Sequence, residues 1–505
     1  MKSVAIVLAL LPLAASAATI TVNTVRDNTI AGNGQCTLRE AIANVNAAAD
    51  TTSGDCTPGS GTGDTITFSL RVPATIQRDP TLGELTVERD VNIAGPANAM
   101  LRISGAGKTR VFEIAAGTTQ VSDVTIWRGN ADHAGGVLVD SGATLNLTHC
   151  TLSGNQAKGG GGGGLSNAGG TVTLTNSTFN GNQARSGNGG GVHNEGMITL
   201  TTCIFNRNLA YPGDGGGIEN GGTLTLSNCT FRGNHARSGG GGAIDSRGTA
   251  TLTNCTVKGN QAGVDGGGIG NSGTVTIGNS TVSGNHAGIN GGGLVNSGTA
   301  TLTNSTVSGN HAGSDVAVGD GGGIENSGSA TLANCTVAEN SAVHGGGGIN
   351  NTAATSIPLT NCTVIRNHAG ARYYGGGIYG PATFTSTILT INDTGARRYD
   401  ENCSGLGACA DGGHNLDSDG TCHLSGNGCI FCGHNGSSLC FRQVNWAPLS
   451  DNGGPTQTIA LLPGSPAIDA GDDSVTGPPD NLTTDQRGLP HLSGAHVDIG
   501  AYEVQ

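Results

Sequence analysis

Three polar residues occupy one position of three successive sequence repeats, and their types are those that could do chemistry. His193, Glu219 and Asp245 each follow a glycine-rich stretch that ends in an apolar residue, at intervals of 26 residues. On neighbouring coils of a repeat structure, two carboxylates would lie about 5 Å apart, the separation used by retaining glycosidases. The spacing makes Glu219, Asp245 and His193 candidate catalytic residues. The alternative is a solvent-facing column that is polar by chance.

The element that must position these side chains is a unit of about 26 residues, repeated from about residue 135 to 385. Each unit holds three short strand patterns, seen at 216–220, 223–226 and 229–231, with period-2 alternation of apolar and polar residues. Units of this length cannot bury their apolar faces alone and must stack. The sequence therefore predicts an all-β fold, a right-handed parallel β-helix with three strands per coil and about eleven coils, capped at both ends.

Asparagines and cysteines also recur at fixed places in the unit. Stacked asparagine amides can form hydrogen-bonded ladders, which we expect at two corners. These corners hold Asn208, Asn234 and Asn260, and Asn228, Asn254 and Asn279. The inward cysteines of neighbouring coils would lie about 4.8 Å apart, so we expect small buried residues there in preference to cross-links or metal ligands.

A second outward column consists of threonines on seven successive units. It comprises Thr173, Thr199, Thr225, Thr251, Thr276, Thr301 and Thr331. Threonine is a favoured strand residue, which explains part of the pattern. The lattice also resembles the flat face of β-solenoid ice-binding proteins, and this resemblance implies a surface for ice or a crystalline glycan.

The repeat resembles the right-handed β-helix family of secreted bacterial proteins. It also resembles the polymorphic outer-membrane protein repeat, through Gly216-Gly217-Ile218 and Phe231-Arg232-Gly233-Asn234. Acidic residues on adjacent coils resemble the sites of β-helical polysaccharide lyases and hydrolases. For a lyase this resemblance implies a Ca²⁺ ion and an arginine or lysine base, for which Arg232 and Arg247 are nearest in sequence.

The N-terminal segments are predicted to be a signal peptide and a cap. Residues 1–17 combine Lys2, an apolar run and Ala15-Ser16-Ala17, which predicts export by a signal peptide. Residues 18–70 resemble the CSLREA-type module through Cys36-Thr-Leu-Arg-Glu-Ala-Ile42. We expect a helix over 38–48 that covers the first coil, a disulfide between Cys36 and Cys56, and an ion pair between Arg39 and Glu40. The β-helix itself is assigned to 71–395.

The segment 396–445 is rich in cysteine. Export predicts three disulfides among its six cysteines, with open connectivity; they are Cys403, Cys409, Cys422, Cys429, Cys432 and Cys440. A zinc site beginning at Cys429 and Cys432 is the alternative. Residues 415–420 resemble the front half of a calcium loop but lack its closing glutamate. We expect no metal site or other cofactor, and Ca²⁺ is the one ion that the pattern suggests.

The final segment, 446–505, resembles the choice-of-anchor Q domain. The similarity rests on Leu449–Thr458, Ala467–Asp472, Asp485–Gly488 and Val497–Glu503. That family precedes surface-anchoring signals, whereas here the sequence ends two residues after Glu503. The resemblance therefore implies release, or attachment through a partner.

Composition limits the classes of function. The 505-residue chain has a net charge of −13, which argues against non-specific binding to nucleic acid or anionic lipid. No later segment is apolar enough to predict a membrane-spanning helix. We expect a secreted or surface-associated monomer that recognises an extracellular glycan or a cell surface. The alternatives are a polysaccharide lyase or glycoside hydrolase using the acidic column, and an ice- or crystal-binding protein using the threonines.

Overall fold

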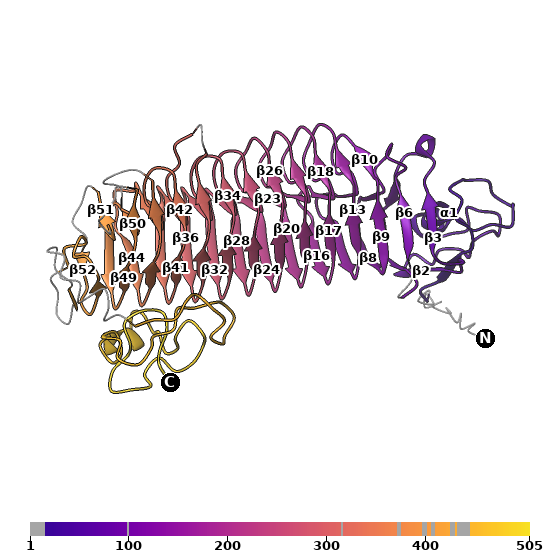
Figure 1. Cartoon of the computed structure of the whole chain (residues 1–505). Coiled ribbons are helices and arrows are strands. Elements are labelled where there is room, and N and C mark those ends of the chain that lie inside the picture. Colours follow the sequence, from indigo (N-terminus) through magenta and orange to yellow (C-terminus); the bar gives the residue numbers. More distant parts are fainter. Residues whose placement is uncertain are drawn as a thin grey trace, which may run out of the picture.

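The computed structural model describes residues 16–97, 100–314, 317–370, 375–395, 401–405, 410–424, 430–431 and 445–505. The chain forms a long right-handed parallel β-solenoid, with the N-terminal cap at one end of the rod (Figure 1). Described elements other than strands are the helix α1 (Leu38–Ala47) and the short 3₁₀ turns Pro80–Leu82 and Asp473–Thr476. None of the helices in these ranges has the length and hydropathy needed to cross a membrane.

Four parallel sheets run along the rod, named A to D here. Sheet A contains β1 (Thr19–Val22), β2 (Asp64–Phe68), β5 (Val91–Ala94), β8 (Thr118–Ser122), β12 (Thr144–Thr148), β16 (Thr171–Thr175), β20 (Met197–Thr201), β24 (Thr223–Ser227), β28 (Thr249–Thr253), β32 (Thr274–Gly278), β36 (Thr299–Thr303), β40 (Ser329–Ala333), β44 (Ile357–Thr360), β48 (Ala382–Thr385) and β52 (Ala410–Asp411). Sheet B contains β3 (Ala74–Gln77), β6 (Leu101–Ser104), β9 (Val124–Trp127), β13 (Thr151–Ser153), β17 (Thr178–Asn180), β21 (Ile204–Asn206), β25 (Thr230–Arg232), β29 (Thr256–Lys258), β33 (Thr281–Ser283), β37 (Thr306–Ser308), β41 (Thr336–Ala338), β45 (Thr363–Ile365), β49 (Ile388–Thr390), β53 (Leu416–Asp417) and β54 (Ile430–Phe431).

Sheet C contains β4 (Leu85–Val87), β7 (Phe112–Ile114), β11 (Val137–Val139), β15 (Leu165–Asn167), β19 (Val192–Asn194), β23 (Ile218–Asn220), β27 (Ile244–Ser246), β31 (Ile269–Asn271), β35 (Leu294–Asn296), β39 (Ile324–Asn326), β43 (Ile349–Asn351), β47 (Ile378–Tyr379) and β51 (Cys403–Ser404). Sheet D contains β10 (Asn130–Ala131), β14 (Gln156–Ala157), β18 (Gln183–Ala184), β22 (Leu209–Ala210), β26 (His235–Ala236), β30 (Gln261–Ala262), β34 (His286–Ala287), β38 (His311–Ala312), β42 (Ser341–Ala342), β46 (His368–Ala369) and β50 (Asp393–Thr394).

The coil differs from the expected one in two details. A typical coil runs through β23, β24, β25 and β26, so it has four strands where three were predicted. The fourth is only two residues long and lies in a segment that the sequence marked as a corner, because so short a strand shows no period. The solenoid has about 13 turns, two more than expected, because coils before residue 135 lack the repeat pattern.

The core lies inside the coil and follows the predicted alternation. Ile218, Leu224, Leu226 and Phe231 are fully buried. Phenylalanines of three successive coils stack, with centroids of Phe179 and Phe205 4.6 Å apart and those of Phe205 and Phe231 4.7 Å apart. The six cysteines of the inward column are buried and free, in agreement with the expectation; they are Cys150, Cys203, Cys229, Cys255, Cys335 and Cys362.

One predicted asparagine ladder is confirmed. At the corner between sheets B and D, the amide of Asn208 donates to Asn234 Oδ1, and that of Asn234 donates to Asn260 Oδ1, both at 2.9 Å. These side chains are fully buried. Each also satisfies backbone groups that the corner would otherwise leave unpaired, as in the bond from Asn234 Nδ2 to Phe205 O.

The other predicted ladder is wrong. Asn228, Asn254 and Asn279 have φ values of 51–55° and form the left-handed turn between sheets A and B, a conformation that asparagine tolerates. The second ladder instead joins the last residues of the sheet C strands, as in the 2.7 Å bond between Asn194 and Asn220. Those asparagines point inward and are buried, so their side-chain amides satisfy one another's hydrogen bonds from coil to coil.

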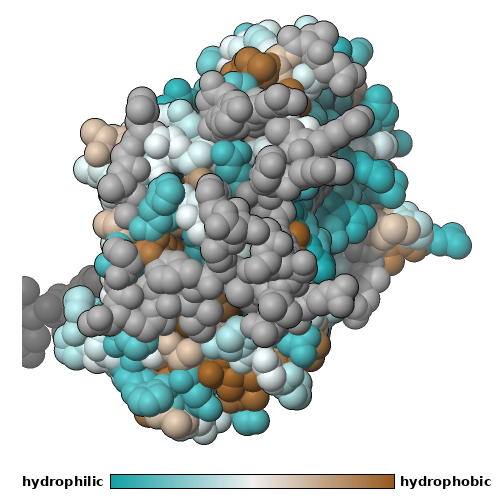
Figure 2. Space-filling model, turned by 60° about the vertical axis from the view of Figure 1, so that its left-hand side comes forward, coloured by the Kyte–Doolittle hydropathy of each residue, from teal (hydrophilic) through white to brown (hydrophobic). Residues whose placement is uncertain are grey.

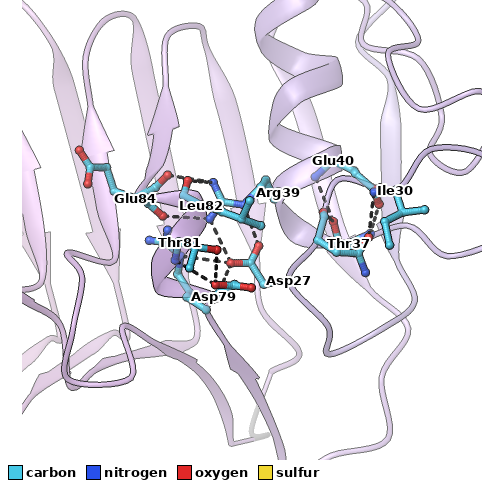
Figure 3. Close-up of polar contacts among 12 residues, drawn as sticks. Asp27, Ile30, Thr37, Arg39, Glu40, Asp79, Thr81, Leu82 and Glu84 are labelled. Carbon is cyan, nitrogen blue, oxygen red and sulfur yellow. Dashed lines mark hydrogen bonds and ion pairs between the residues drawn. The ribbon is translucent and has the colours of Figure 1, made fainter.

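The N-terminal cap has the predicted helix and disulfide but different ion pairing, and Figure 3 shows the polar contacts at the start of the helix. Helix α1 begins with a capping box, in which Thr37 accepts from the Glu40 backbone and Glu40 accepts from the Thr37 backbone. Arg39 pairs with Asp27 at 2.8 Å and not with Glu40, so that expectation is wrong. Adjacent residues on a helix face different directions, which explains why the two side chains separate. Cys36 and Cys56 form the expected disulfide.

At the other end, a disulfide joins Cys403 and Cys422. Their four companions, Cys409, Cys429, Cys432 and Cys440, lie outside the described residues. In the half-loop that resembled a calcium site, Asp417 accepts hydrogen bonds from Asn402 and from the Cys422 backbone. The calcium interpretation stays a prediction.

The C-terminal segment 445–505 packs against the outer face of sheet B, below β41 and β49 in Figure 1. Gln486 is buried there and bonds both Thr306 Oγ1, at 2.7 Å, and Thr336 Oγ1, at 2.6 Å. Seen from the C-terminal end, the coloured surface is mainly hydrophilic, and apolar residues form small separate groups (Figure 2). The coils that carry the catalytic candidates lie nearer the N-terminus and are not covered by this segment.

Candidate functional site

The three candidate catalytic residues stack on successive coils of sheet C. In the parallel register, His193 pairs with Glu219, and Glu219 pairs with Asp245. Each occupies the middle position of its strand, between two inward-facing residues, and therefore points outward. The structure thus brings together the residues that the spacing selected, while their catalytic role stays a prediction.

Glu219 is nevertheless completely buried. His193 covers it from one side, with Nδ1 2.5 Å from Glu219 Oε2. On the other side, Arg247 forms an ion pair with Oε1, to which its Nε also donates at 3.1 Å. Both carboxylate oxygens are therefore occupied by cationic side chains, and a substrate has no direct path to them.

Each charged group of this network shifts the pKa of its neighbour so that the charged form is favoured. Burial alone would raise the pKa of Glu219, but the contacts with His193 and Arg247 hold that pKa below its usual value. Burial would likewise lower the pKa of His193, but the carboxylates of Glu219 and Glu195 keep it above its usual value. The arrangement favours the charged forms of both groups, as in a structural ion-pair network, and keeps the Glu219 carboxyl group from acting as a general acid near neutrality.

Asp245 has the opposite electrostatics. Burial, together with the negative charges of Asp214 and Glu219, raises the pKa of its carboxyl group to about 7. Farther along the same outward column, burial raises the pKa of Glu325 to about 7 as well. Asp245 is thus the one carboxyl group of the predicted trio whose proton could be exchanged near neutral pH.

Asp214 belongs to a ladder that sequence reasoning missed. Its Oδ1 accepts from the Gly240 backbone at 2.8 Å, and Asp265 and Asp320 accept similarly from the next coils. Aspartates before a glycine in every second loop, with Gly240 and Asn290 at the positions between, were the available signal. Their role is to hold the glycine-rich turns together, and they add negative charge beside Asp245.

Of the two arginines considered as a lyase base, only Arg247 belongs to the cluster. Arg232 lies on β25 of sheet B and is exposed on another face. A further group missed in the sequence is Glu195, whose Oε1 lies 3.5 Å from His193 Nε2. His193, Glu195 and Glu219 present possible ligand atoms within 4.8 Å of one another. Arg247 already supplies positive charge at this place, so we interpret the cluster as an ion-pair network.

The threonine column is in register along sheet A. Successive pairs join Thr173 to Thr199 and continue without interruption to Thr331. The outward positions of β16 to β40 contain no charged residue, and Met197 is their only long side chain. The result is a flat, hydroxyl-rich face.

A basic hollow on sheet D was also missed. It is lined by Lys158, Arg185, Tyr211 and Arg237, each of which follows the alanine of a sheet D strand. The signal in the sequence is a column of residues after a repeated alanine, but strands of two residues hide it. The volume of the hollow is about 490 Å³.

A match to a protein-family model supports the fold. The family described as "Right handed beta helix region" matches residues 135–307. The chain is similar to the crystal structure of pectate lyase Pel9A, with 14% identity, a TM-score of 0.28, and coverage of 96% of this chain and 98% of that one. It is also similar to a mannuronic acid specific polysaccharide family 6 lyase from human gut microbiota, with 11% identity, a TM-score of 0.31, and coverage of 76% and 91%. No curated protein matches.

The family match covers the repeats from β11 to β37 and agrees with the observed coils. At the TM-scores given, the two lyases carry no argument about the activity of this chain. The resemblances of the terminal segments to CSLREA and choice-of-anchor Q modules stay predictions.

Proposed function

We propose that this protein is a secreted or surface-associated recognition protein that binds an extracellular glycan without cleaving it. The observation that supports this most strongly is the outer face of sheet A, where in-register threonines present a charge-free lattice of hydroxyl groups over seven coils. A rigid, repeating set of hydrogen-bonding groups suits an extended, repeating ligand that carries hydroxyl groups.

The state of Glu219 argues against the enzymatic alternative. Retaining glycosidases need two accessible carboxylates, and here one of the pair is fully buried and bound by Arg247 and His193. A polysaccharide lyase or hydrolase remains the second candidate because the Asp245 carboxyl has a pKa of about 7. Ice or crystal binding is the third, since it would use the same threonines.

The test combines binding and product assays on the full chain. We expect retention of at least one polysaccharide on a glycan array and no release of unsaturated or reducing-end products. A double variant, Thr225→Lys/Thr276→Lys, places two bulky charges on the face and should abolish that retention. Thr230→Lys on sheet B is the matched control.

Each alternative has its own outcome. Product release that disappears in Glu219→Gln, while the variant stays folded, would establish the enzyme. Thermal hysteresis or inhibition of ice recrystallisation by the wild type would establish the ice-binding function. An array with no retained glycan would refute the proposal.

A further inference from the structure

The basic hollow on sheet D lies on the side of the rod away from the C-terminal segment. In Figure 1, β18 and β26 follow the upper edge of the solenoid, whereas the C-terminal segment lies below it. The backbone amides of Arg185, Tyr211 and Arg237 each donate to the carbonyl of the alanine one coil before. Together with Lys158, these residues occupy equivalent positions on four successive coils.

Their side chains stand in a row along the solenoid axis, about 4.8 Å apart from coil to coil. The floor between them is formed by Gln183 and Leu209, which are neighbours in the register of sheet D. Such a row borders an open, shallow trough that can take an extended chain along the axis.

The cations of this row form no ion pair within the described residues, although Asp132 holds the equivalent position on the coil before Lys158. Among the described residues, no carboxylate lies within 4.0 Å of Lys158, Arg185 or Arg237. Like charges on neighbouring coils cost stability and need a reason beyond folding. The chain has a net charge of −13, so this row is a local positive patch on an acidic protein. An anionic ligand bound there would neutralise its charge.

Two contacts orient the row. The guanidinium of Arg237 lies over the Tyr211 ring, 5.0 Å from its centroid, and Tyr211 is still 46% exposed. With the Gln156 amide turned so that both its ends are satisfied, its oxygen accepts from Arg185 Nε at 2.7 Å and Nη2 at 2.9 Å. The second guanidinium is thus held in place by a neutral group that leaves its charge available.

We propose that the hollow binds an acidic polysaccharide, one whose sugar units carry carboxylates or sulfates. Guanidinium groups bind such anions through paired, charge-assisted hydrogen bonds. Tyr211 offers an aromatic surface to the sugar rings, and Gln183 and Ser186 offer polar groups to their hydroxyls. This inference rests on the proposed glycan-recognition role and adds a second binding site, on sheet D, to the threonine face of sheet A, with acidic glycans as its ligand class.

The density of charge distinguishes this ligand from nucleic acid. Three cations are spread over three coil steps, about 14 Å. Duplex DNA carries one negative charge per about 1.7 Å, far more than the row can neutralise. A polysaccharide with about one anionic group per sugar unit has a spacing nearer to that of the coils.

The experiment measures binding of trigalacturonate and of its methyl ester to the full chain by calorimetry. We compare the wild type with Arg185→Ala, Arg237→Ala and Tyr211→Ala. Arg232→Ala, on the exposed face of sheet B, removes the same charge away from the hollow and is the control. A heparin fragment, a neutral oligosaccharide and a single-stranded DNA oligonucleotide complete the set of probes.

We expect the wild type to bind trigalacturonate or the heparin fragment, and the methyl ester and neutral sugar much more weakly. Each arginine variant should bind the acidic probe about 10- to 100-fold more weakly, as expected for loss of a hydrogen bond to a charged group. Arg232→Ala should bind like the wild type. Tyr211→Ala should weaken binding with an unchanged salt dependence, because no charge is lost.

Acidic-glycan binding that the arginine variants leave intact would overturn this inference and leave the proposed function standing. So would binding of neutral glycans alone on the threonine face. Preference for the DNA probe, lost in the arginine variants, would replace the glycan by nucleic acid and overturn it. Failure to bind any glycan would refute both proposals.

Discussion

Two clusters of charged side chains, on sheets C and D of the same solenoid, differ in whether they form ion pairs. On sheet C, Glu219 is buried between His193 and Arg247, so charges are paired within the protein. On sheet D, Lys158, Arg185 and Arg237 stand on nearby coils with no carboxylate within ion-pair distance among the described residues. The charges of the sheet C cluster are therefore paired within the protein, whereas the cations of the row on sheet D form no ion pair among the described residues.

This difference teaches where to look for function in a regular solenoid. A cluster of catalytic residue types attracts attention in the sequence, yet in this structure much of it serves to stabilise neighbouring coils. Uncompensated like charges reduce stability and so indicate an interaction with something outside the chain. The four predictions that follow test this contrast.

The largest effect is expected from Glu219→Ala. Loss of the buried carboxylate leaves Arg247 without its ion-pair partner and leaves His193 with only the exposed Glu195. We expect a loss of about 3 kcal/mol in the free energy of unfolding, the lower end for breaking a buried pair, because Arg247 is 51% exposed. Urea unfolding measures it. Glu195→Ala, whose side chain is 54% exposed, should change stability by less than about 0.5 kcal/mol; equal effects of the two would contradict the contrast.

The second effect depends on pH and concerns Asp245→Asn. The folded-state pKa of Asp245 is raised to about 7, so its contribution to stability is complete below about pH 4 and is lost as the pH rises towards 7. At pH 8 the variant should therefore be more stable than the wild type, and at pH 4 the two should be alike. The rise of this pKa from 3.8 to about 7 corresponds to about 4 kcal/mol, which solvent screening of this partly exposed side chain reduces to on the order of 2 kcal/mol. Thermal unfolding across this range measures the difference. A gap that is constant with pH would show that Asp245 does not titrate as described.

Glu219 should show the reverse dependence. Its folded-state pKa is lowered, so its contribution is present above the unfolded pKa and is lost as the pH falls through the folded value. Two carboxylates on adjacent coils would then respond to acid in opposite directions.

A third, smaller effect is expected from Arg237→Ala. The side chain is exposed, and its contact with the Tyr211 ring is worth about 1 kcal/mol at most. Unfolding should therefore change by less than this amount, although binding of an acidic glycan is strongly reduced. Destabilisation comparable to that of Glu219→Ala would mean that sheet D charges are structural too.

The smallest expected effect is an increase in the free energy of unfolding. Arg185→Glu replaces the like-charge neighbour of Lys158 by an opposite charge on the next coil. We expect stability to rise by about 0.3 kcal/mol, typical of an exposed pair, while acidic-glycan binding is lost. Differential scanning calorimetry can detect the gain. A clear loss of stability would show that the Arg185 contact with Gln156 outweighs the repulsion.

Most of the fold could be predicted because each inward position of the repeat has a simple physical requirement. Leu224 and Phe231 follow a period of two, and the Asn234 corner recurs without exception through several coils. The fourth strand could not be predicted, because two residues show no period. The ladder assigned to Asn228 was wrong because spacing alone does not tell an inward corner from an outward, left-handed one.

The candidate site was predictable in its register but not in its environment. Aligning repeats placed His193, Glu219 and Asp245 on one column. Burial of Glu219 depends on Arg247, which comes from the turn after the next coil's strand, and on how the rings and guanidinium pack over it. Those contacts are set by side-chain conformations, on which sequence spacing has no bearing.

The attachment of the C-terminal segment has a consequence for how this protein can change in length. Its anchoring contacts begin at Asn304, whose carbonyl accepts from Thr456, and the basic hollow ends at Arg237. Coils in between contact only their neighbours, so a whole repeat between Gly242 and Thr281 could be duplicated or lost without touching either. Such a change would lengthen or shorten the threonine face by one rung. Recombination among near-identical repeats would then change the length of the solenoid and leave the basic hollow and the C-terminal attachment intact.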